Sequence, residues 1–412
     1  MPGLNTENEE IKMQRNICQI CGKDMSESGE VLYSRIYDTP EINEDRYIQK
    51  IGCCDNCGFV TVLNPLDDTE MDKHYSSGYD YTNYSSLEIE KDNYIERANK
   101  AMKLFESLRL EYDSVLDIGA STGYFLSLFE GKKVYGVETS DSGVYTAKQR
   151  YNIELYHGQF QEFVKRSGKP YDLIIMMHIL EHIDNLDIWM KDLKKSASRY
   201  VYVEVPCLFT SPVEPFGLFG EEHLNYFTPA SLESLFVKYG FLCIHMSIDY
   251  MVNYKIANGF PMIRAIFEKD RGEERQTHIH EMIGSHVFLD NYFSWSRSTS
   301  SEILDKLKKI IHSDDSVAIW GASFQTERLL GENDYSWMNL DCILDNSDMR
   351  CRYSLSYNGK LIPVRKPDKD ILDKVDHIII STYNNQEAIY RQIKDMGYES
   401  KAIILYDPLM IG

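Results

Sequence analysis

The stretch VLDIGASTG, residues 115–123, decides the fold of this chain. An apolar strand runs into a glycine-rich turn, and a helix pattern follows. Such a turn between strand and helix lets a ligand approach the backbone amides at the helix N-terminus. The next strand, residues 134–138, ends on Glu138, whose carboxylate can accept both hydroxyls of a ribose. This ordered set predicts a pocket for a nucleoside cofactor.

The spacing of the glycines narrows the kind of cofactor. Enzymes that bind a dinucleotide pyrophosphate use G-x-G-x-x-G at this turn, whereas here three residues separate Gly119 from Gly123 and Asp117 precedes both. A carboxylate has no obvious role beside a pyrophosphate, but it can accept from a cationic amine. S-adenosylmethionine carries both an amine and a ribose, so we expect it in preference to a nicotinamide dinucleotide.

Strand and helix patterns alternate around this stretch. Strands are predicted at 114–118, 133–138, 172–177, 200–205 and 241–247, with helices at 140–150, 186–196 and 230–239. Alternation of this kind predicts a parallel, doubly wound α/β sheet. It resumes after a mixed segment, with strands predicted at 316–320, 340–344, 377–381 and 402–405. We therefore expect a second, smaller C-terminal α/β domain.

Paired cysteines mark the N-terminal part of the chain. Cys18-x-x-Cys21 and Cys54-x-x-Cys57 each place two sulfurs on one tight turn, and two such turns supply the four ligands of a tetrahedral zinc site. Short β-prone runs lie between them, in a segment too small to bury a core of its own. The pattern predicts a zinc ribbon with a closed, structural metal site. A redox pair is the alternative, and the second Cys-x-x-Cys disfavours it.

Bulk composition excludes several classes of function. The chain has 412 residues, which favours several domains, and a formal net charge of −20. That charge argues against a nucleic-acid partner, because phosphates need a basic surface. Nine cysteines without a signal peptide indicate a reducing, cytoplasmic compartment. The longest apolar run, residues 173–177, is too short for membrane insertion.

Three domains are expected on these grounds. They are a zinc-binding ribbon over residues 1–74, a cofactor-binding domain over 75–250, and linker helices with a Rossmann-like domain over 251–412. In the last of these, the turn Gly321-Ala322-Ser323 is followed by Asp345 near the end of the next strand. This turn either binds the diphosphate of a nucleotide at a helix N-terminus or serves the structure alone.

The motifs resemble those of the class I S-adenosylmethionine-dependent methyltransferases over about residues 110–245. The resemblance rests on residues 116–123 and on GVE (136–138), YDLI (171–174), HILEHI (178–183), HLNYFT (223–228) and YGF (239–241). It implies a Rossmann-like methyltransferase domain and assigns the cofactor contacts as follows. The methionine and ribose lie along Asp117, Gly119, Ala120 and Gly123, the ribose diol lies on Glu138 beside Thr139, adenine lies between Gln159 and Phe160, and the sulfonium lies near Met177 and His178.

The cysteine-rich segment narrows the resemblance. The run from Cys54 to Pro65, followed by HYSSGY (74–79), is similar to the zinc-bearing methyltransferases of bacterial glycan and sugar pathways. The order of ribbon, methyltransferase and C-terminal α/β domain resembles the C-methyltransferases that act on nucleotide-linked keto-deoxysugars. This resemblance implies a nucleotide-linked sugar as the substrate.

Within that family a Glu-His pair follows the fifth strand, and Glu222-His223 matches it. Methylation of a carbon beside a ketone needs a base, and an imidazole suits this work. The resemblance implies His223 as base, Glu222 as its orienting carboxylate, and Tyr75 or Tyr79 as a hydroxyl donor. A structural or substrate-binding role for His223 stays open. His182 is expected to pack or to line the pocket.

The sequence therefore predicts a methyltransferase acting on an activated sugar, with C-methylation beside a keto group as the leading hypothesis. Two departures from the family pattern favour sugar O-methylation as the alternative. Gly220 stands where a tyrosine is usual, and GFPMIR (259–264) replaces a Gly-Gly-Ser-Leu-Arg run. A nicotinamide-dependent sugar oxidoreductase and a non-catalytic scaffold are further alternatives, and the glycine spacing and the Asp117–Glu138 pair disfavour them.

Overall fold

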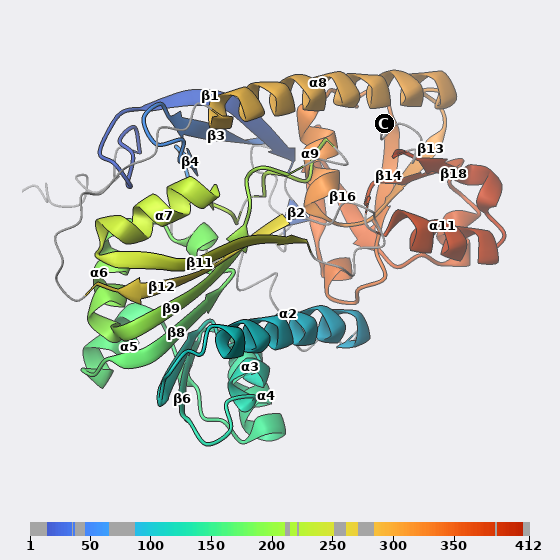
Figure 1. The fold of residues 1–412 in the computed structure, drawn as a ribbon. Helices are drawn as coiled ribbons and strands as arrows, with labels where there is room; N and C mark the ends of the chain where they lie inside the picture. The colour runs from blue at the N-terminus through green and yellow to red at the C-terminus, as the bar shows by residue number, and fades with distance from the viewer. Residues whose placement is uncertain are drawn as a thin grey trace, which may run out of the picture.

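The computed structural model describes residues 15–34, 36–37, 46–65, 87–210, 215–220, 222–250, 261–270, 284–383 and 385–406. The chain forms three β-sheets in this part, two of seven strands and one of four (Figure 1). The sequence predictions for Tyr75 and Tyr79 lie outside the described residues. No helix of the described part is long and apolar enough to cross a membrane.

A seven-stranded sheet forms the centre of the molecule. Its strands, in spatial order, are β11 (Phe241–Tyr250), β12 (Pro261–Lys269), β9 (Ala197–Pro206), β8 (Tyr171–Met177), β5 (Ser114–Ile118), β6 (Lys133–Glu138) and β7 (Tyr156–His157). The five strands from β9 to β7 run parallel, whereas β12 is antiparallel to both β9 and β11. The predicted doubly wound α/β fold is confirmed, because the parallel strands alternate with helices as the sequence indicated.

Strand β12 belongs to the central sheet although it lies beyond residue 250. It pairs with β9 from Met262 to Glu268, so the central sheet extends to Lys269. The sequence patterns did not predict this strand because an antiparallel strand needs no crossover helix. Strand-helix alternation, the signal for the other strands of the sheet, therefore ends one strand too early.

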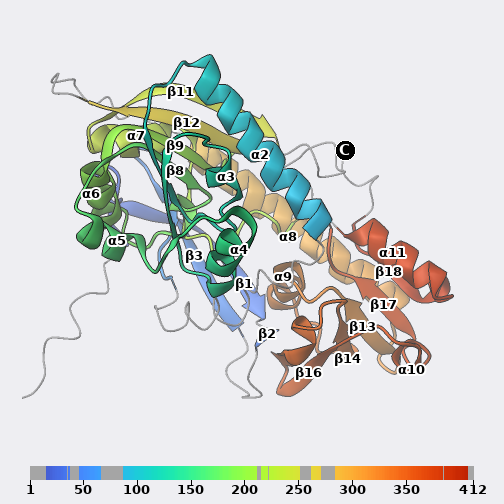
Figure 2. The same cartoon turned by 90° about the horizontal axis from the view of Figure 1, so that it is seen from below.

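Helices cover both faces of the central sheet. They are α2 (Leu87–Ser107), α3 (Tyr124–Ser127), α4 (Asp141–Tyr151), α5 (Phe160–Ser167), α6 (Leu186–Ser196) and α7 (Pro229–Lys238). Apolar side chains of α5, α6 and α7 pack with one set of strand residues, including Leu116 and Ile174. Side chains of α2 and α3 pack with the alternate set, including Val115 and Ile175. Figure 2 shows α2 lying across its face of the sheet.

The N-terminal sheet is antiparallel and includes a strand from the central part of the chain. Its order is β1 (Met25–Ser34), β3 (Arg46–Cys54), β4 (Val60–Val62) and β10 (Asn225–Tyr226). Strand β10 pairs Asn225 with Thr61 and Tyr226 with Val60. The small sheet shares an apolar cluster with Leu208 and Phe219, so the residues that follow β9 lie against it.

The C-terminal sheet is also mixed. Its order is β18 (Ala402–Ile404), β17 (His377–Ile380), β13 (Ser316–Trp320), β14 (Asn339–Leu344), β16 (Lys360–Arg365), β15 (Ser354–Tyr357) and β2 (Ile36–Tyr37). The first five strands are parallel, as expected of an α/β unit, and β15 and β2 extend them antiparallel. Its helical elements are α9 (Phe324–Glu332), η2 (Arg350–Arg352), α10 (Lys369–Leu372), α11 (Gln386–Asp395) and η3 (Glu399–Lys401).

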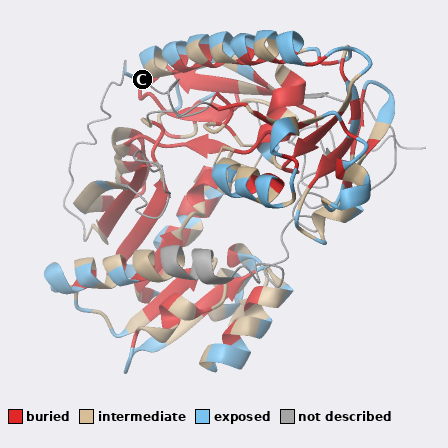
Figure 3. Cartoon of the chain, turned by 90° about the vertical axis from the view of Figure 1, so that its right-hand side faces the viewer, coloured by how far each residue is buried: buried red, intermediate tan, exposed pale blue. Residues whose placement is uncertain are grey.

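Helix α8 (Gly284–Ile310) joins the N-terminal and C-terminal sheets (Figure 1). At one end the Ser285 hydroxyl donates to the Gly58 carbonyl, and near the other the Lys306 ammonium donates to the Ile404 carbonyl. Its outer side is exposed, whereas the strands beneath are buried (Figure 3). Together with β2 and β10, the helix ties segments that are distant in the sequence.

Candidate cofactor, acceptor and metal sites

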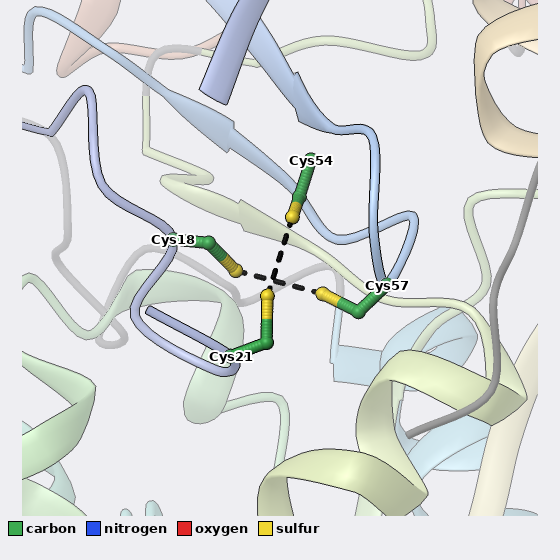
Figure 4. A group of neighbouring side chains, drawn as sticks. All are labelled: Cys18, Cys21, Cys54 and Cys57. Atoms are coloured by element: carbon green, nitrogen blue, oxygen red, sulfur yellow. Dashed lines mark hydrogen bonds between the residues drawn. The ribbon is translucent and has the colours of Figure 1, made fainter. Parts of the chain in front are cut away.

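The four predicted zinc ligands lie together in the N-terminal sheet (Figure 4). Their sulfur atoms lie within 4.8 Å of one another, with 3.5 Å between Cys18 and Cys57 and 3.4 Å between Cys21 and Cys54. A zinc ion about 2.3 Å from each of four thiolates places the sulfurs roughly 3.8 Å apart. No disulfide joins them. The four side chains therefore fit a closed tetrahedral ion.

The two cysteine turns have the same backbone geometry. In each, the amide of the glycine after the second cysteine donates to the carbonyl of the first, at 2.9 Å for Gly22 and 2.8 Å for Gly58. Both glycines are left-handed, with φ of 72° and 67°, a conformation that side-chain-bearing residues rarely adopt. The glycine that follows each Cys-x-x-Cys is thus a further sequence signal for this geometry, beyond the spacing of the cysteines.

The glycine-rich turn follows β5 as predicted. Asp117 lies at the end of the strand with 3% of its surface exposed, and within the described part of the chain its carboxylate makes no hydrogen bond. Burial, together with the neighbouring Glu138 carboxylate, raises the pKa of Asp117 well above its usual range. A cationic group placed here would restore the charged form. The turn itself contains Gly119 and Gly123 at positive φ, with Ala120 buried between them.

Glu138 is held by backbone amides at the edge of this turn. One carboxylate oxygen accepts from Ser121 at 2.7 Å, and the other accepts from Thr139 at 2.9 Å and Ser140 at 2.8 Å. A carboxylate offers about four acceptor positions, so capacity remains for a hydroxyl group. These three bonds fix the carboxylate before any ligand arrives, and they join the turns after β5 and β6.

The residues expected beside adenine lie at the start of α5. Gln159 is the N-cap of this helix. The ring of Phe160 is 3% exposed and packs against Trp189 at 4.8 Å between ring centroids. The ring thus packs in the core, and its contact with adenine stays a prediction. Contact of Gln159 with adenine stays a prediction.

The end of β8 carries a polar cluster next to the glycine turn. Met177 ends the strand, and His178 follows it at a φ of 56°. The backbone amide of His178 donates to the Glu204 carbonyl at 2.8 Å, and its ring lies 2.9 Å from Glu181 and 3.6 Å from Glu204. Burial opposes protonation of this ring, but contacts with the two carboxylates outweigh it and raise the pKa of His178.

Glu204 is a central residue of the cluster that the sequence patterns did not predict. Glu204 is fully buried in β9. Its carboxylate forms ion pairs with Arg97 of α2 at 2.5 Å and with Arg264 of β12 at 2.6 Å. Burial alone would raise its pKa, but His178 and the two arginines lower it. A charged residue inside an otherwise apolar strand was an available signal for both Glu204 and Arg264. Nothing in the sequence around Arg97 pointed to it.

His223 is positioned by segments from two other parts of the chain. The amide of the next residue, Leu224, donates to the Glu181 carbonyl at 2.7 Å, and the Leu224 carbonyl accepts from Val62 of β4 at 2.9 Å. The His223 ring lies 4.9 Å from the His182 ring, between centroids. Burial, and secondarily His182, lower the pKa of His223 to about 4, so the imidazole is neutral at pH 7.

Glu222 and His182 form the remaining part of this region. The Nδ1 atom of His182 donates to the backbone carbonyl of Glu222 at 2.9 Å. His182 belongs to the short helix η1 (Leu180–His182), whose Glu181 is 1% exposed. Burial opposes ionisation of Glu181, but His178, His182 and His223 lower its pKa to about 2. The structure thus brings together His178, Glu181, His182 and His223, of which only His178 and His223 were predicted site residues.

Comparison with known proteins identifies the class of protein to which this segment is similar. A family model described as a methyltransferase domain matches residues 90–246, the segment that contains the glycine turn, Glu138 and the histidine cluster. These residues are a class I S-adenosylmethionine-dependent methyltransferase domain. The protein is accordingly a methyltransferase that uses S-adenosylmethionine. No curated protein matches the sequence.

Solved structures of methyltransferases are similar to this part of the chain. Magnesium protoporphyrin IX methyltransferase from Synechocystis PCC 6803, with bound SAH, has 15% identity and a TM-score of 0.38, covering 49% of this chain and 100% of that one. A SAM-dependent methyltransferase from Archaeoglobus fulgidus has 19% identity and a TM-score of 0.35, covering 46% and 100%. The 1,6-didemethyltoxoflavin-N1-methyltransferase of Burkholderia thailandensis has 15% identity and a TM-score of 0.37, covering 54% of this chain and 96% of that one.

Proposed function

We propose that this methyltransferase acts on an activated, nucleotide-linked sugar and methylates a carbon beside a keto group. The observation that carries the proposal is the position of His223. Its neutral imidazole lies in the polar cluster at the end of β8, next to the turn that holds the cofactor residues. The motif resemblance to sugar C-methyltransferases supplies the substrate class.

C-methylation beside a ketone needs a base that removes a proton from the acceptor. S-adenosylmethionine supplies an electrophilic methyl group on a sulfonium. His223 in this role takes the proton from the carbon next to the ketone. The cofactor, when bound, would supply the methyl group to that carbon through cleavage of its S–CH3 bond and would leave as S-adenosylhomocysteine. The neutral form of His223 leaves a ring nitrogen able to accept that proton. Tyr75 and Tyr79 remain candidates for a hydroxyl that stabilises the enolate oxygen.

We also propose that S-adenosylmethionine binds at the first glycine turn. Asp117 is proposed to receive the amine of the methionine part and Glu138 the ribose diol. The buried carboxylate of Asp117, unpartnered among the described residues, supports this assignment, because an ionised group in such a place needs a cationic partner. The nucleotide part of the substrate is proposed to lie at the second turn, Gly321-Ala322-Ser323.

The test is proton exchange at the sugar carbon. The enzyme is incubated in D2O with a panel of nucleotide-linked keto sugars and without a methyl donor, and deuterium is followed by mass spectrometry. C-methylation predicts wash-in of deuterium that is lost in His223→Asn, together with a fall in turnover of about 10²–10⁴. Glu222→Gln is expected to show a smaller fall.

Two controls keep this result interpretable. S-adenosylmethionine affinity, measured by calorimetry, is expected to be unchanged in His223→Asn, since the histidine lies on the acceptor side. Methyl transfer to sugar oxygen without wash-in would replace the carbon chemistry by O-methylation. Failure to methylate any sugar of the panel would overturn the substrate class.

The cysteine cluster is proposed to hold one zinc ion per chain. Cys54→Ser is expected to remove the metal and to lower stability, because zinc-bound thiolates contribute folding free energy directly. The matched control is Cys53→Ala, which changes a buried neighbour that is not one of the four clustered sulfurs. Zinc content by mass spectrometry is expected to fall by one ion per chain in the first variant and to equal that of the native chain in the second.

A further inference from the structure

Glu181, His182 and His223 form a second cluster of metal-ligand type, away from the cysteines. One ligand atom from each residue lies within 4.8 Å of the others. Glu181 and His182 come from η1, and His223 comes from the segment before β10. The cluster contains nitrogen and oxygen donors, in contrast to the all-sulfur donors of the N-terminal sheet.

The Glu181 carboxylate is the observation that points to a ligand. The residue is 1% exposed, and neither of its side-chain oxygens has a hydrogen-bond partner among the described residues. His178 lies at ion-pair distance, 2.9 Å, but without hydrogen-bond alignment. Leaving a buried carboxylate without hydrogen bonds is unfavourable. A cation among the three side chains removes this deficit.

We propose that Glu181, His182 and His223 bind a divalent transition-metal ion. Two imidazoles and one carboxylate are a recurrent ligand set for such ions, and they leave coordination positions open for other ligands. A bound ion would draw the three atoms closer than in the structure. Both histidines are partly exposed.

The surroundings of His182 match those of a metal-bound imidazole. Its Nδ1 atom lies 2.9 Å from the Glu222 carbonyl, which can only accept, so the proton is on Nδ1 and an ion would bind Nε2. Metal-binding histidines usually donate their second nitrogen to such an oxygen, which fixes the ring. The bond also gives the Glu222-His223 pair a role through its backbone.

Hydrogen bonds hold the two halves of the cluster in place. Leu224 donates its amide to the Glu181 carbonyl at 2.7 Å, and the side-chain amide of Asn225 donates to Leu180 at 3.0 Å and to Ile183 at 2.7 Å. The backbones on either side of the proposed ion are thus tied directly to each other. This arrangement resists separation of the ligands when the site is empty.

The ion would change how the acceptor is activated. Its open positions suit two neighbouring oxygens of the acceptor, and a Lewis acid bound to the keto oxygen makes the adjacent C–H more acidic. A histidine that binds a metal through one nitrogen does not take a proton there. With the ion bound, His223 would therefore act as a ligand, and this role would replace the role as base given to it under the proposed function. This consequence rests on the proposed function, whereas metal binding itself does not.

Manganese binding to the full chain tests the proposal. Mn²⁺ is suited to nitrogen and oxygen ligands and is not the ion that thiolates select, so it reports this site without competing for the cysteines. Electron paramagnetic resonance is expected to show one bound Mn²⁺ per chain without any sugar or cofactor. Glu181→Gln and His223→Asn are each expected to weaken binding at least about tenfold, whereas His157→Asn, which changes an exposed histidine, binds as the native chain does.

Zinc stoichiometry provides a second readout. The demetallated native chain is expected to take up two zinc ions, Glu181→Gln one and Cys54→Ser one. Absence of Mn²⁺ binding together with a single zinc in the native chain would overturn the proposal, as would unaltered Mn²⁺ affinity in Glu181→Gln. If Glu181→Gln fails to fold, the partly exposed His223→Asn decides. Metal binding without sugar methylation would refute the substrate class and leave the metal site standing.

Discussion

The two seven-stranded sheets contain the same strand-turn-helix device, and they use it differently. In the central sheet the carboxylate of Glu138, at the end of β6, accepts the amide of Ser121 in the turn after β5 at 2.7 Å. In the C-terminal sheet the carboxylate of Asp345, just after β14, accepts the amide of Ala322 in the turn after β13 at 3.0 Å. Each turn is thus braced by an acidic residue from the neighbouring strand.

The difference lies in what precedes and fills the turn. Two residues before its glycine, the central turn has the buried Asp117, whereas the C-terminal turn has the apolar Ile319. The carbonyl of Gly321 is bonded by the Thr326 and Ser381 hydroxyls. In the C-terminal turn the glycine carbonyl is therefore bonded by side chains and no buried carboxylate precedes the glycine, although the Ser323 hydroxyl has no hydrogen-bond partner among the described residues. The central turn instead has the buried carboxylate of Asp117, which could meet a charged ligand. The buried carboxylate, more than the glycine pattern, distinguishes the turn that suits a cationic cofactor from the turn that does not.

The largest expected effect is the loss of Glu138. Glu138→Ala removes three amide bonds and the proposed ribose contact, so S-adenosylmethionine affinity is expected to fall by about 100-fold. Asp345→Ala makes the matched change in the other turn and is expected to leave that affinity unchanged. Calorimetric titration of both variants checks this. Equal losses would show that the two turns do not differ in the way proposed.

A smaller effect is expected for Asp117. Asp117→Asn removes the charge that faces the amine, and S-adenosylmethionine affinity is expected to fall by about tenfold. Burial raises the pKa of Asp117, so the ionised carboxylate opposes folding at pH 7. The variant is therefore expected to melt at the same or a higher temperature than the native chain. A lower melting temperature with unchanged affinity would make Asp117 a structural residue.

Gly321→Ala is expected to affect stability without affecting the cofactor. The glycine has a φ of 126°, and an added Cβ would lie 2.3 Å from a methyl carbon of Thr382. The free energy of unfolding is expected to fall by about 1–3 kcal/mol, as measured by denaturant titration. S-adenosylmethionine affinity, measured in parallel, should not change. Weakened cofactor binding would reveal a connection between the sheets that the comparison lacks.

The smallest expected effect is the release of protons when the cofactor binds. Burial and Glu138 raise the pKa of Asp117, so a proton on this carboxylate competes with a cationic amine, and binding of the amine is expected to release it. Affinity is then expected to rise with pH until Asp117 is fully ionised. Calorimetry in buffers of different ionisation enthalpy measures the release, which should be less than one proton per site and absent in Asp117→Asn. Proton uptake on binding would contradict the assignment, with Tyr94 and Glu138 the other titratable groups near this carboxylate.

Local patterns predicted most of the parallel strands of both large sheets, because a buried parallel strand is a short apolar run followed by a helix. The parallel strands β7 and β16, and the antiparallel strand β15, were not predicted. Strands β2, β10 and β12 were missed for one shared reason. Their partners come from distant parts of the chain or run antiparallel, and no local period records this. The candidate site likewise contains residues that local sequence predicts and contacts that only the folded chain creates. Asp117 and Glu138 follow from turn chemistry, whereas the contact of Arg97 with Glu204 exists only after α2 has packed on the sheet.

The pairing of β10 with β4 also has a consequence for folding while the chain is being synthesised. The cysteines and β4 leave the ribosome long before residues 225–226, and at roughly 5–20 residues per second the interval is about 8–30 s. During this time the edge of β4 has no partner strand, and exposed strand edges invite pairing with other chains. Early uptake of the proposed zinc ion would hold the three finished strands together over this interval. A shortage of the metal should then appear as aggregation of nascent protein before it appears as loss of activity.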